Sequence, residues 1–295
     1  MAAKIEIPNE LKQDLPQNKW GKVLGATPIV MTVIATMLAG LASSEMTKAQ
    51  YDRAFAAQLQ SKAGDQWGYF QAKKLRSAVA HNSLDLLAAS VEVAPLTATA
   101  LPTTDEATVN ALVKTELPPA TPAKFDDAVN AALTALANSA PEPEITADLA
   151  KIKPVELDGA LKAAQDAANA FDQTTKPVNK AIDKLDEMLP DGDRNVFRSF
   201  SAAHLRYMAA RYDAEAKLNQ TVASVYELQV RQNNHSAEKH HRRSAKFFYG
   251  MLASQMAVII STFAIAARKR SFLWSIAAAA GAAAVSFSIY VYLYV

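Results

Sequence analysis

The stretch VLGATPIVMTVIATMLAGLASS, residues 23–44, carries no Asp, Glu, Lys, Arg or His. Two later stretches share this property: FFYGMLASQMAVIISTFAIAA at residues 247–267 and SFLWSIAAAAGAAAVSFSIYVYLYV at residues 271–295. A helix needs about 20 apolar residues to cross the hydrocarbon core of a bilayer. Each stretch is long enough. The sequence therefore predicts an all-α membrane protein with three transmembrane helices at these positions.

A cleaved signal peptide is the alternative for the first stretch. Lys19 and Lys22 give it a basic start, and Gly40 and Ala42 would suit a cleavage site. The apolar run is, however, longer than the roughly 7–15 residues of a signal core. We therefore interpret it as a membrane anchor.

Charge is distributed unevenly along a chain whose formal net charge is only +2. Residues 91–194 hold 18 acidic and 9 basic side chains, a net of −9, and the rest holds 11 acidic and 22 basic, a net of +11. Basic residues beside a membrane are attracted to anionic headgroups, whereas an acidic surface is repelled. The acidic section is therefore expected to lie away from the bilayer. Nucleic acid is not expected as a partner, because the basic residues border the spans.

The two regions beside the acidic section predict long helices. After a polar tail, residues 1–22, and the first span, residues 45–90 contain no proline, and neither do residues 194–246. At 1.5 Å per residue these arms would extend for roughly 68 and 80 Å. They lead out from and back to one membrane face, which predicts an antiparallel helical-hairpin stalk. Thr27-Pro28 resembles a helix start, and Asp193 resembles the N-cap of the returning arm.

Residues 91–193 differ in composition from the arms, since ten of the thirteen prolines fall between positions 95 and 190. Between them lie Ala-rich amphipathic segments, which predict a small helical tip domain. The alternative is a partly disordered acidic linker. The expected helices are at approximately 104–117, 123–139, 155–174 and 177–189.

Aromatic, apolar and small residues indicate where helices meet. Aromatic and apolar residues recur at helical spacing on both arms, and the third span contains a run of Ala and Gly that permits close helix packing. The residues expected to support self-association, and thus a homo-oligomer, are Trp67, Phe70, Leu205, Met208, Tyr212 and Gly281.

Basic and aromatic residues border the spans, where lipid headgroups are expected. These residues are Trp20, His240, His241, Arg242, Arg243, Lys246, Arg268, Lys269 and Arg270. The positive-inside rule, applied to the short loops, places the N-terminus in the cytoplasm and the soluble section outside it. The cluster at residues 240–246 opposes this orientation. The expected location is a bacterial inner membrane.

Few residues suggest chemistry. The chain has no cysteine, which excludes disulfides and thiol catalysis. His235, Glu238 and His241 are weak candidates for a metal site, because steps of three drift around a helix and no second Glu-x-x-His motif exists. His204 is expected to be an interface histidine. With no nucleophile–base pairing or phosphate loop, we expect neither an enzyme nor a bound cofactor.

Two other functions stay open. An oligomeric channel or transport accessory could be lined by Thr32 and Thr36 or by Gln255, although these residues equally suit interhelical hydrogen bonds. A membrane sensor could bind a ligand or protein partner at the acidic section, residues 91–193. The function that we expect first is a non-enzymatic, membrane-anchored scaffold or interaction protein.

The run Asp65-Gln66-Trp67, with the following aromatics and Gln71-Ala72-Lys73, resembles the signature of an uncharacterised bacterial membrane-protein family, domain of unknown function 4337. The resemblance covers roughly residues 20–90 and 200–295. It implies one N-terminal span, a helical arm and two final spans in a bacterial inner membrane, and it implies no known activity. Residues 91–194 resemble an insertion.

Overall fold

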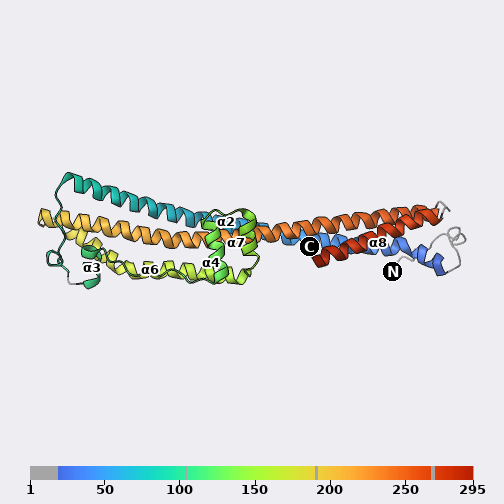
Figure 1. Cartoon of the computed structure of the whole chain (residues 1–295), viewed down its shortest axis with the longest axis horizontal. Coiled ribbons are helices and arrows are strands. Elements are labelled where there is room, and N and C mark those ends of the chain that lie inside the picture. The colour runs from blue at the N-terminus through green and yellow to red at the C-terminus, as the bar shows by residue number, and fades with distance from the viewer. Residues whose placement is uncertain (1–18, 104, 190–191, 267–269, 295) are drawn as a thin grey trace, which may run out of the picture. The chain divides into compact units, whose positions relative to one another are not determined.

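The computed structural model describes residues 19–103, 105–189, 192–266 and 270–294, and within these it is all-helical (Figure 1). The chain divides into two compact units. The first comprises Met1–Ala54 and Asn234–Val295, and the second comprises Phe55–Asn233. The elements are α2 (Lys19–Ser90), the 3-10 turn η1 (Ala98–Ala100), α3 (Glu106–Lys114), α4 (Asp127–Ala137), α5 (Glu142–Leu149), α6 (Pro154–Met188), α7 (Arg194–Ala266) and α8 (Arg270–Tyr294).

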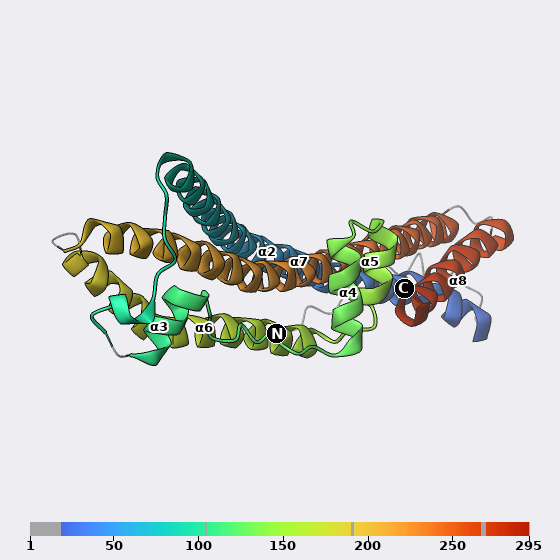
Figure 2. The ribbon, with the colours of Figure 1, turned by 60° about the vertical axis from the view of Figure 1, so that its left-hand side comes forward.

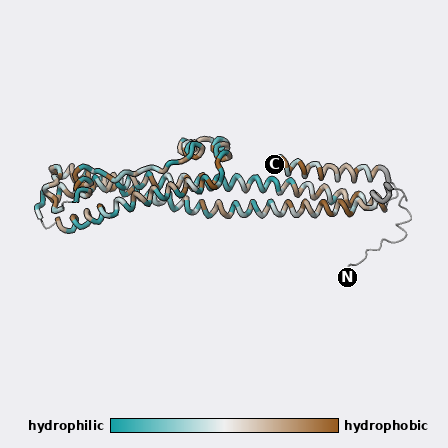
Figure 3. Tube along the Cα trace, turned by 90° about the horizontal axis from the view of Figure 1, so that it is seen from below, coloured by the Kyte–Doolittle hydropathy of each residue, from teal (hydrophilic) through white to brown (hydrophobic). Residues whose placement is uncertain are grey.

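The first unit contains the three predicted spans. Parts of α2, α7 and α8 are each long and apolar enough to cross a membrane, and Figure 3 shows hydrophobic residues prevailing along them. Most of their apolar side chains point outward, as the environment of lipid tails allows. The prediction of three helices that could span a membrane is confirmed, which suggests a multi-pass membrane protein.

In this unit α2 and α7 are antiparallel. Ser244 Oγ donates a hydrogen bond to the Ala42 carbonyl oxygen at 2.7 Å, and Arg53 lies 3.9 Å from Glu238. The later residue of α2 thus contacts the earlier residue of α7, as expected for two antiparallel helices. The small residues of α8 pack inside the unit, because a Cβ on Gly281 would lie 2.6 Å from the Met31 Cε atom.

The expected helix start at Thr27-Pro28 is wrong. Helix α2 begins at Lys19 and continues through Pro28. Proline removes one backbone hydrogen bond, but within a membrane a helix is held by its neighbours and by the need to satisfy every other backbone group. By contrast, Asp193 behaves as predicted at the start of α7, since its carboxylate accepts a hydrogen bond from the Asn195 N–H at 2.8 Å.

The second unit confirms the antiparallel pairing of the arms. Lys74 Nζ donates to Asp213 at 3.0 Å, and Lys73 pairs with Glu215. Nearer to the first unit along the chain, Leu59 packs with α7 residues in a shared apolar cluster. Both arms are uninterrupted helices, and α2 continues through Gly64 and Gly68.

The acidic section is helical, as predicted, but its long helix is continuous. We expected separate helices at 155–174 and 177–189, and α6 instead runs from Pro154 to Met188 with Pro177 inside it. Side chains on both sides of this proline, Phe171 and Val178, are buried. That packing outweighs the single lost backbone hydrogen bond. The sequence also missed α5.

Helix α6 lies alongside α7, and the short helices α4 and α5 stand across the direction of both (Figure 2). One core joins α4, α5 and the start of α6 to Val225 and Leu228 of α7. Another joins α3 and the end of α6 to Phe200 and Tyr207. The acidic section therefore adds a third layer to the paired arms.

We predict that Leu157→Ala will loosen α4 and α5. Leu157 is fully buried in the core that holds these helices, and removing a buried leucine side chain typically costs about 2–5 kcal/mol. Hydrogen–deuterium exchange should accelerate in residues 127–149. The control is Val155→Ala, two positions away on an exposed side chain. Equal exchange in the two variants would contradict this account of the core.

Candidate functional site: a charged collar beside the spans

A group of charged side chains lies directly beside the predicted spans, and we call Glu45, Lys48, His240 and Arg243 the collar. Glu45 follows the first charge-free stretch, and Lys48 comes one helical turn later. His240 and Arg243 are likewise one turn apart on α7, just before the second stretch. Residues three apart share a helix face, so each helix presents two collar residues to the other.

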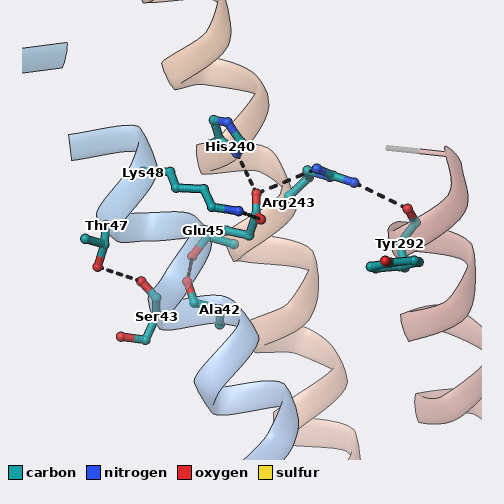
Figure 4. Close-up of polar contacts among 9 residues, drawn as sticks. Ala42, Ser43, Glu45, Thr47, Lys48, His240, Arg243 and Tyr292 are labelled. Carbon is teal, nitrogen blue, oxygen red and sulfur yellow. Dashed lines mark hydrogen bonds and ion pairs between the residues drawn. The ribbon is translucent and has the colours of Figure 1, made fainter. Parts of the chain in front are cut away.

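Glu45 is the centre of the collar (Figure 4). Its carboxylate lies 2.9 Å from Lys48 Nζ, 2.6 Å from His240 Nδ1 and 3.8 Å from Arg243. Only 8% of Glu45 is exposed. A buried carboxylate is costly unless it is paired and hydrogen-bonded. Here three cationic or hydrogen-bonding groups from two helices meet that requirement.

Arg243 of the collar and the nearby Lys246 also contact the third helix, α8. Arg243 donates to the Tyr292 carbonyl oxygen at 3.3 Å, and Lys246 lies 5.9 Å from the centre of the Tyr290 ring. The last carbonyl groups of a helix carry partial negative charge, which favours a cation at this end of α8. One arginine thus bridges the acidic residue of α2 and the end of α8 (Figure 4).

Two opposing influences act on the pKa of the Glu45 carboxyl group. Burial by itself raises the pKa, but hydrogen bonds from His240 and Lys48, together with their charges, lower it below the usual value of 4.5. The carboxylate is therefore ionised at neutral pH, where it balances the cations around it.

Of the other residues expected at the lipid headgroups, some have described side chains and some do not. Arg242 is exposed and donates to Glu238 at 3.0 Å, and His241 is half-buried. Arg268 and Lys269 lie outside the described residues, as do the side chains of Trp20 and Arg270. Glu45 and Lys48 were missed as partners, although an acid–base pair one turn apart directly after an apolar stretch is a visible signal.

His235, Glu238 and His241 are not brought together as metal ligands. Across the described ranges of the chain, no group of three His, Asp or Glu side chains is placed to hold a metal ion. Glu238 instead pairs with Arg242, while His235 is exposed. The three side chains start from positions that drift around α7, which is the geometric obstacle expected from their spacing.

The residues expected to support self-association are in different environments. Trp67 and Phe70 are half-buried and contact each other edge to face, with ring centres 5.5 Å apart. Leu205 and Met208 are also half-buried.

Two of these residues make close contacts within the chain. Tyr212 is buried beside Arg211, whose guanidinium lies 4.6 Å from its ring centre. Gly281 faces Met31. Cation–π contact and close helix packing thus involve both positions, and their part in self-association stays a prediction.

A second buried charged group joins three helices of the second unit. Glu215 of α7 pairs with Lys73 of α2 and lies 3.5 Å from Arg211. Burial, and then the charge of Glu215, raise the pKa of the Asp172 carboxyl group on α6. Buried polar residues of this kind can set the register of packed helices. No spacing in the sequence indicates that these distant residues meet.

His204 occupies an interface, as expected. Its ring centre lies 5.6 Å from that of Phe200, and Nδ1 lies 3.9 Å from Asp186. Burial lowers the pKa of this histidine, although the nearby acidic groups oppose the shift. The imidazole is therefore mostly neutral at pH 7, which suits a packing residue better than a proton carrier.

We predict that Glu45→Gln will destabilise the first unit at neutral pH by about 2 kcal/mol, because it removes a charged hydrogen-bond acceptor from among three donors. The folded pKa lies below 4.5, so the stabilisation is present above pH 4.5 and is lost as pH falls through the folded value. Thermal unfolding in nanodiscs should therefore separate wild type and variant at pH 7, and the difference should shrink below pH 4.5.

The matched control is Glu92→Gln, at an exposed position. Its thermal unfolding temperature should equal that of the wild type at every pH. A constant difference between wild type and Glu45→Gln down to pH 3 would show that charge at Glu45 is not the cause.

Comparison with known proteins adds a family and nothing more specific. No curated protein and no solved structure matches this chain. One part of the chain, residues 20–119, matches a family model. The match extends through α3, beyond residue 90 where the resemblance noted from the sequence ends, and residues 200–295 lie outside it. That family model is described as a domain of unknown function, 4337.

Proposed function

We propose that the protein is a non-enzymatic, membrane-anchored scaffold that self-associates through α2. The observation that carries this proposal is a row of apolar side chains on the water-exposed part of that helix. Leu75, Val79 and Leu86 are 66%, 54% and 69% exposed. Ala72 and Ala89 extend the row, and both are exposed.

The row has the spacing of a coiled-coil seam. Ala72, Leu75, Val79, Leu86 and Ala89 occupy positions a, d, a, a and d of successive heptads, and the intervening d position holds an amide, Asn82. Large exposed apolar residues scattered singly need no explanation, but a row in one register favours a helical partner.

The opposite side of α2 is already occupied within the chain. Ser77 and Ala80 are buried, and Lys73 pairs with Glu215 of α7. The row around Val79 therefore lies on the side that the chain's own helices leave uncovered. A second copy inserted in the same membrane would direct its α2 the same way, and a parallel pair places identical heptad positions opposite each other.

Association of this kind needs no large interface. About two and a half heptads are short for a coiled coil in solution. Anchoring in a bilayer raises the effective concentration of neighbouring copies, so a weak contact suffices. The acidic helices α3 to α6 then offer a charged surface to a protein partner, which we propose as the second role of the scaffold.

For location we propose a bacterial inner membrane, with the N-terminus in the cytoplasm and the soluble section outside it. The support is the basic loop at residues 268–270 and the basic residues of the N-terminal tail, read by the positive-inside rule. The basic residues at 240–246 oppose it. Three of them, however, have partners inside the first unit, through Glu45, Glu238 and the end of α8.

We predict that a single cysteine at Val79 will cross-link two copies. The natural chain has no cysteine, so Val79→Cys in native membranes should form a disulfide-linked dimer on mild oxidation. The matched control is His81→Cys, which is exposed but lies two positions away around the helix. Leu75→Glu, introduced together with Val79→Cys, should reduce the cross-linked fraction at least about tenfold, since it buries a charge at the seam.

Three results would count against this scaffold. They are equal cross-linking at positions 79 and 81, no effect of Leu75→Glu, or a monomer by mass photometry in nanodiscs at every lipid-to-protein ratio tested.

A separate prediction tests the orientation. Ser139 is exposed at the end of α4, so Ser139→Cys should react in intact cells with a maleimide that crosses only the outer membrane. Labelling that requires rupture of the inner membrane would place the soluble section in the cytoplasm. A cysteine at Lys151, also in the soluble section, should give the same answer.

A further inference from the structure

We infer that the seam between α2 and α7 in the first unit is a binding site for one anionic phospholipid. An apolar groove lies along this seam, and two arginines lie one and two helical turns past its lining residues. The inference is independent of self-association, because it concerns a different unit and a different part of α2.

The groove consists of two adjoining hollows of about 490 Å³ each. Ala39 and Met251 line both, so the hollows form one continuous channel along the helices. It extends from Thr32 at one end to Met46 at the other, about 21 Å along the helix axis. One leaflet of the hydrocarbon core is roughly 15 Å thick. The groove is thus long enough for the acyl chain of a lipid in that leaflet.

The lining of the groove is apolar where a chain would lie. Alanine, methionine, phenylalanine and branched aliphatic side chains make up most of it. Three of the lining hydroxyl groups are already bonded: Thr32 donates to the Pro28 carbonyl at 2.8 Å, Thr36 to the Thr32 carbonyl at 2.9 Å, and Ser244 to the Ala42 carbonyl at 2.7 Å. The other polar lining residues are Ser43, Tyr249 and Gln255.

Helix α8 lies on the other side of the seam. It approaches Leu38 and Gly250, and its Val291 joins the cluster of Leu38 and Phe247. In the described part of the chain, no α8 residue lines the groove. The groove is therefore open to the lipid phase.

Positive charge lies past the Met46 end of the groove. Arg53 lies two turns beyond Met46 on the same face of α2, and Arg242 lies one turn before the lining residue Ala245 on α7. Both approach Glu238, at 3.9 Å and 3.0 Å. Two guanidinium groups against one carboxylate leave a net charge of one, and both arginine side chains are more than half exposed.

This chemistry favours a phosphate group over a zwitterionic or neutral headgroup. Guanidinium groups donate paired hydrogen bonds to phosphate oxygens. Among the described contacts Arg242 uses Nε for Glu238, which leaves its two terminal nitrogens to donate to a phosphate group. Basic pockets between transmembrane helices are typical sites for anionic headgroups.

The test uses the full-length protein in nanodiscs of equal phosphatidylglycerol and phosphatidylcholine, with bound lipids counted by native mass spectrometry. We expect one phosphatidylglycerol per chain to be retained over phosphatidylcholine. Arg53→Gln with Arg242→Gln should lower that preference by about fivefold for each arginine removed. The matched control is Lys62→Gln with Lys239→Gln, two exposed cations that do not border the groove; it should keep the preference.

A second variant tests the groove itself. Ala39→Trp should fill the channel and abolish retention of either lipid, while Leu41→Trp, an exposed position at the same depth, should not. Equal retention of the two lipids by the wild type, or an unchanged preference without the arginines, would overturn the inference. So would an Ala39→Trp protein that keeps its lipid but loses its oligomer, since a second copy would then occupy the groove.

Discussion

Every backbone polar group inside a bilayer must be hydrogen-bonded within its own segment, and this constraint underlies the whole molecule. The three charge-free stretches can satisfy it only as helices. Two of them continue without a break into water, as α2 and α7. The soluble section is therefore built on a pair of helices whose direction and pairing begin with the requirements of the membrane. The proline-rich part of the chain then adds α6 and the short helices to this pair.

Buried charge links α2 to α7 at two places, one in each unit. In the first, Glu45 accepts from both α2 and α7 and is linked through Arg243 to the end of α8. In the second, Glu215 pairs with Lys73 and raises the pKa of Asp172 on a third helix. Apolar helix surfaces can slide past one another at little cost. Buried ion pairs cannot, because a shifted register would leave a charge unpaired.

The two surfaces proposed to bind partners are what this packing leaves uncovered. On α2 the row at Leu75, Val79 and Leu86 lies away from α7, and α8 closes only one side of the α2–α7 seam beside the collar. One surface faces water and suits a second helix. The other faces lipid and suits an acyl chain with its phosphate.

Local physics made much of this readable in the sequence. The charge-free stretches predicted the three candidate spans, and the absence of proline predicted the helical arms. Asp193 predicted the start of α7. The structure alone decided which face of α2 is covered, because this helix is apolar on two sides: Trp67 and Phe70 lie on the partly buried side, and Val79 on the open one. It also decided that α6 continues through Pro177 and that Glu45 meets His240, 195 residues away. Hydrophobic spacing is a property of one helix, whereas burial and charge pairing depend on which helices become neighbours.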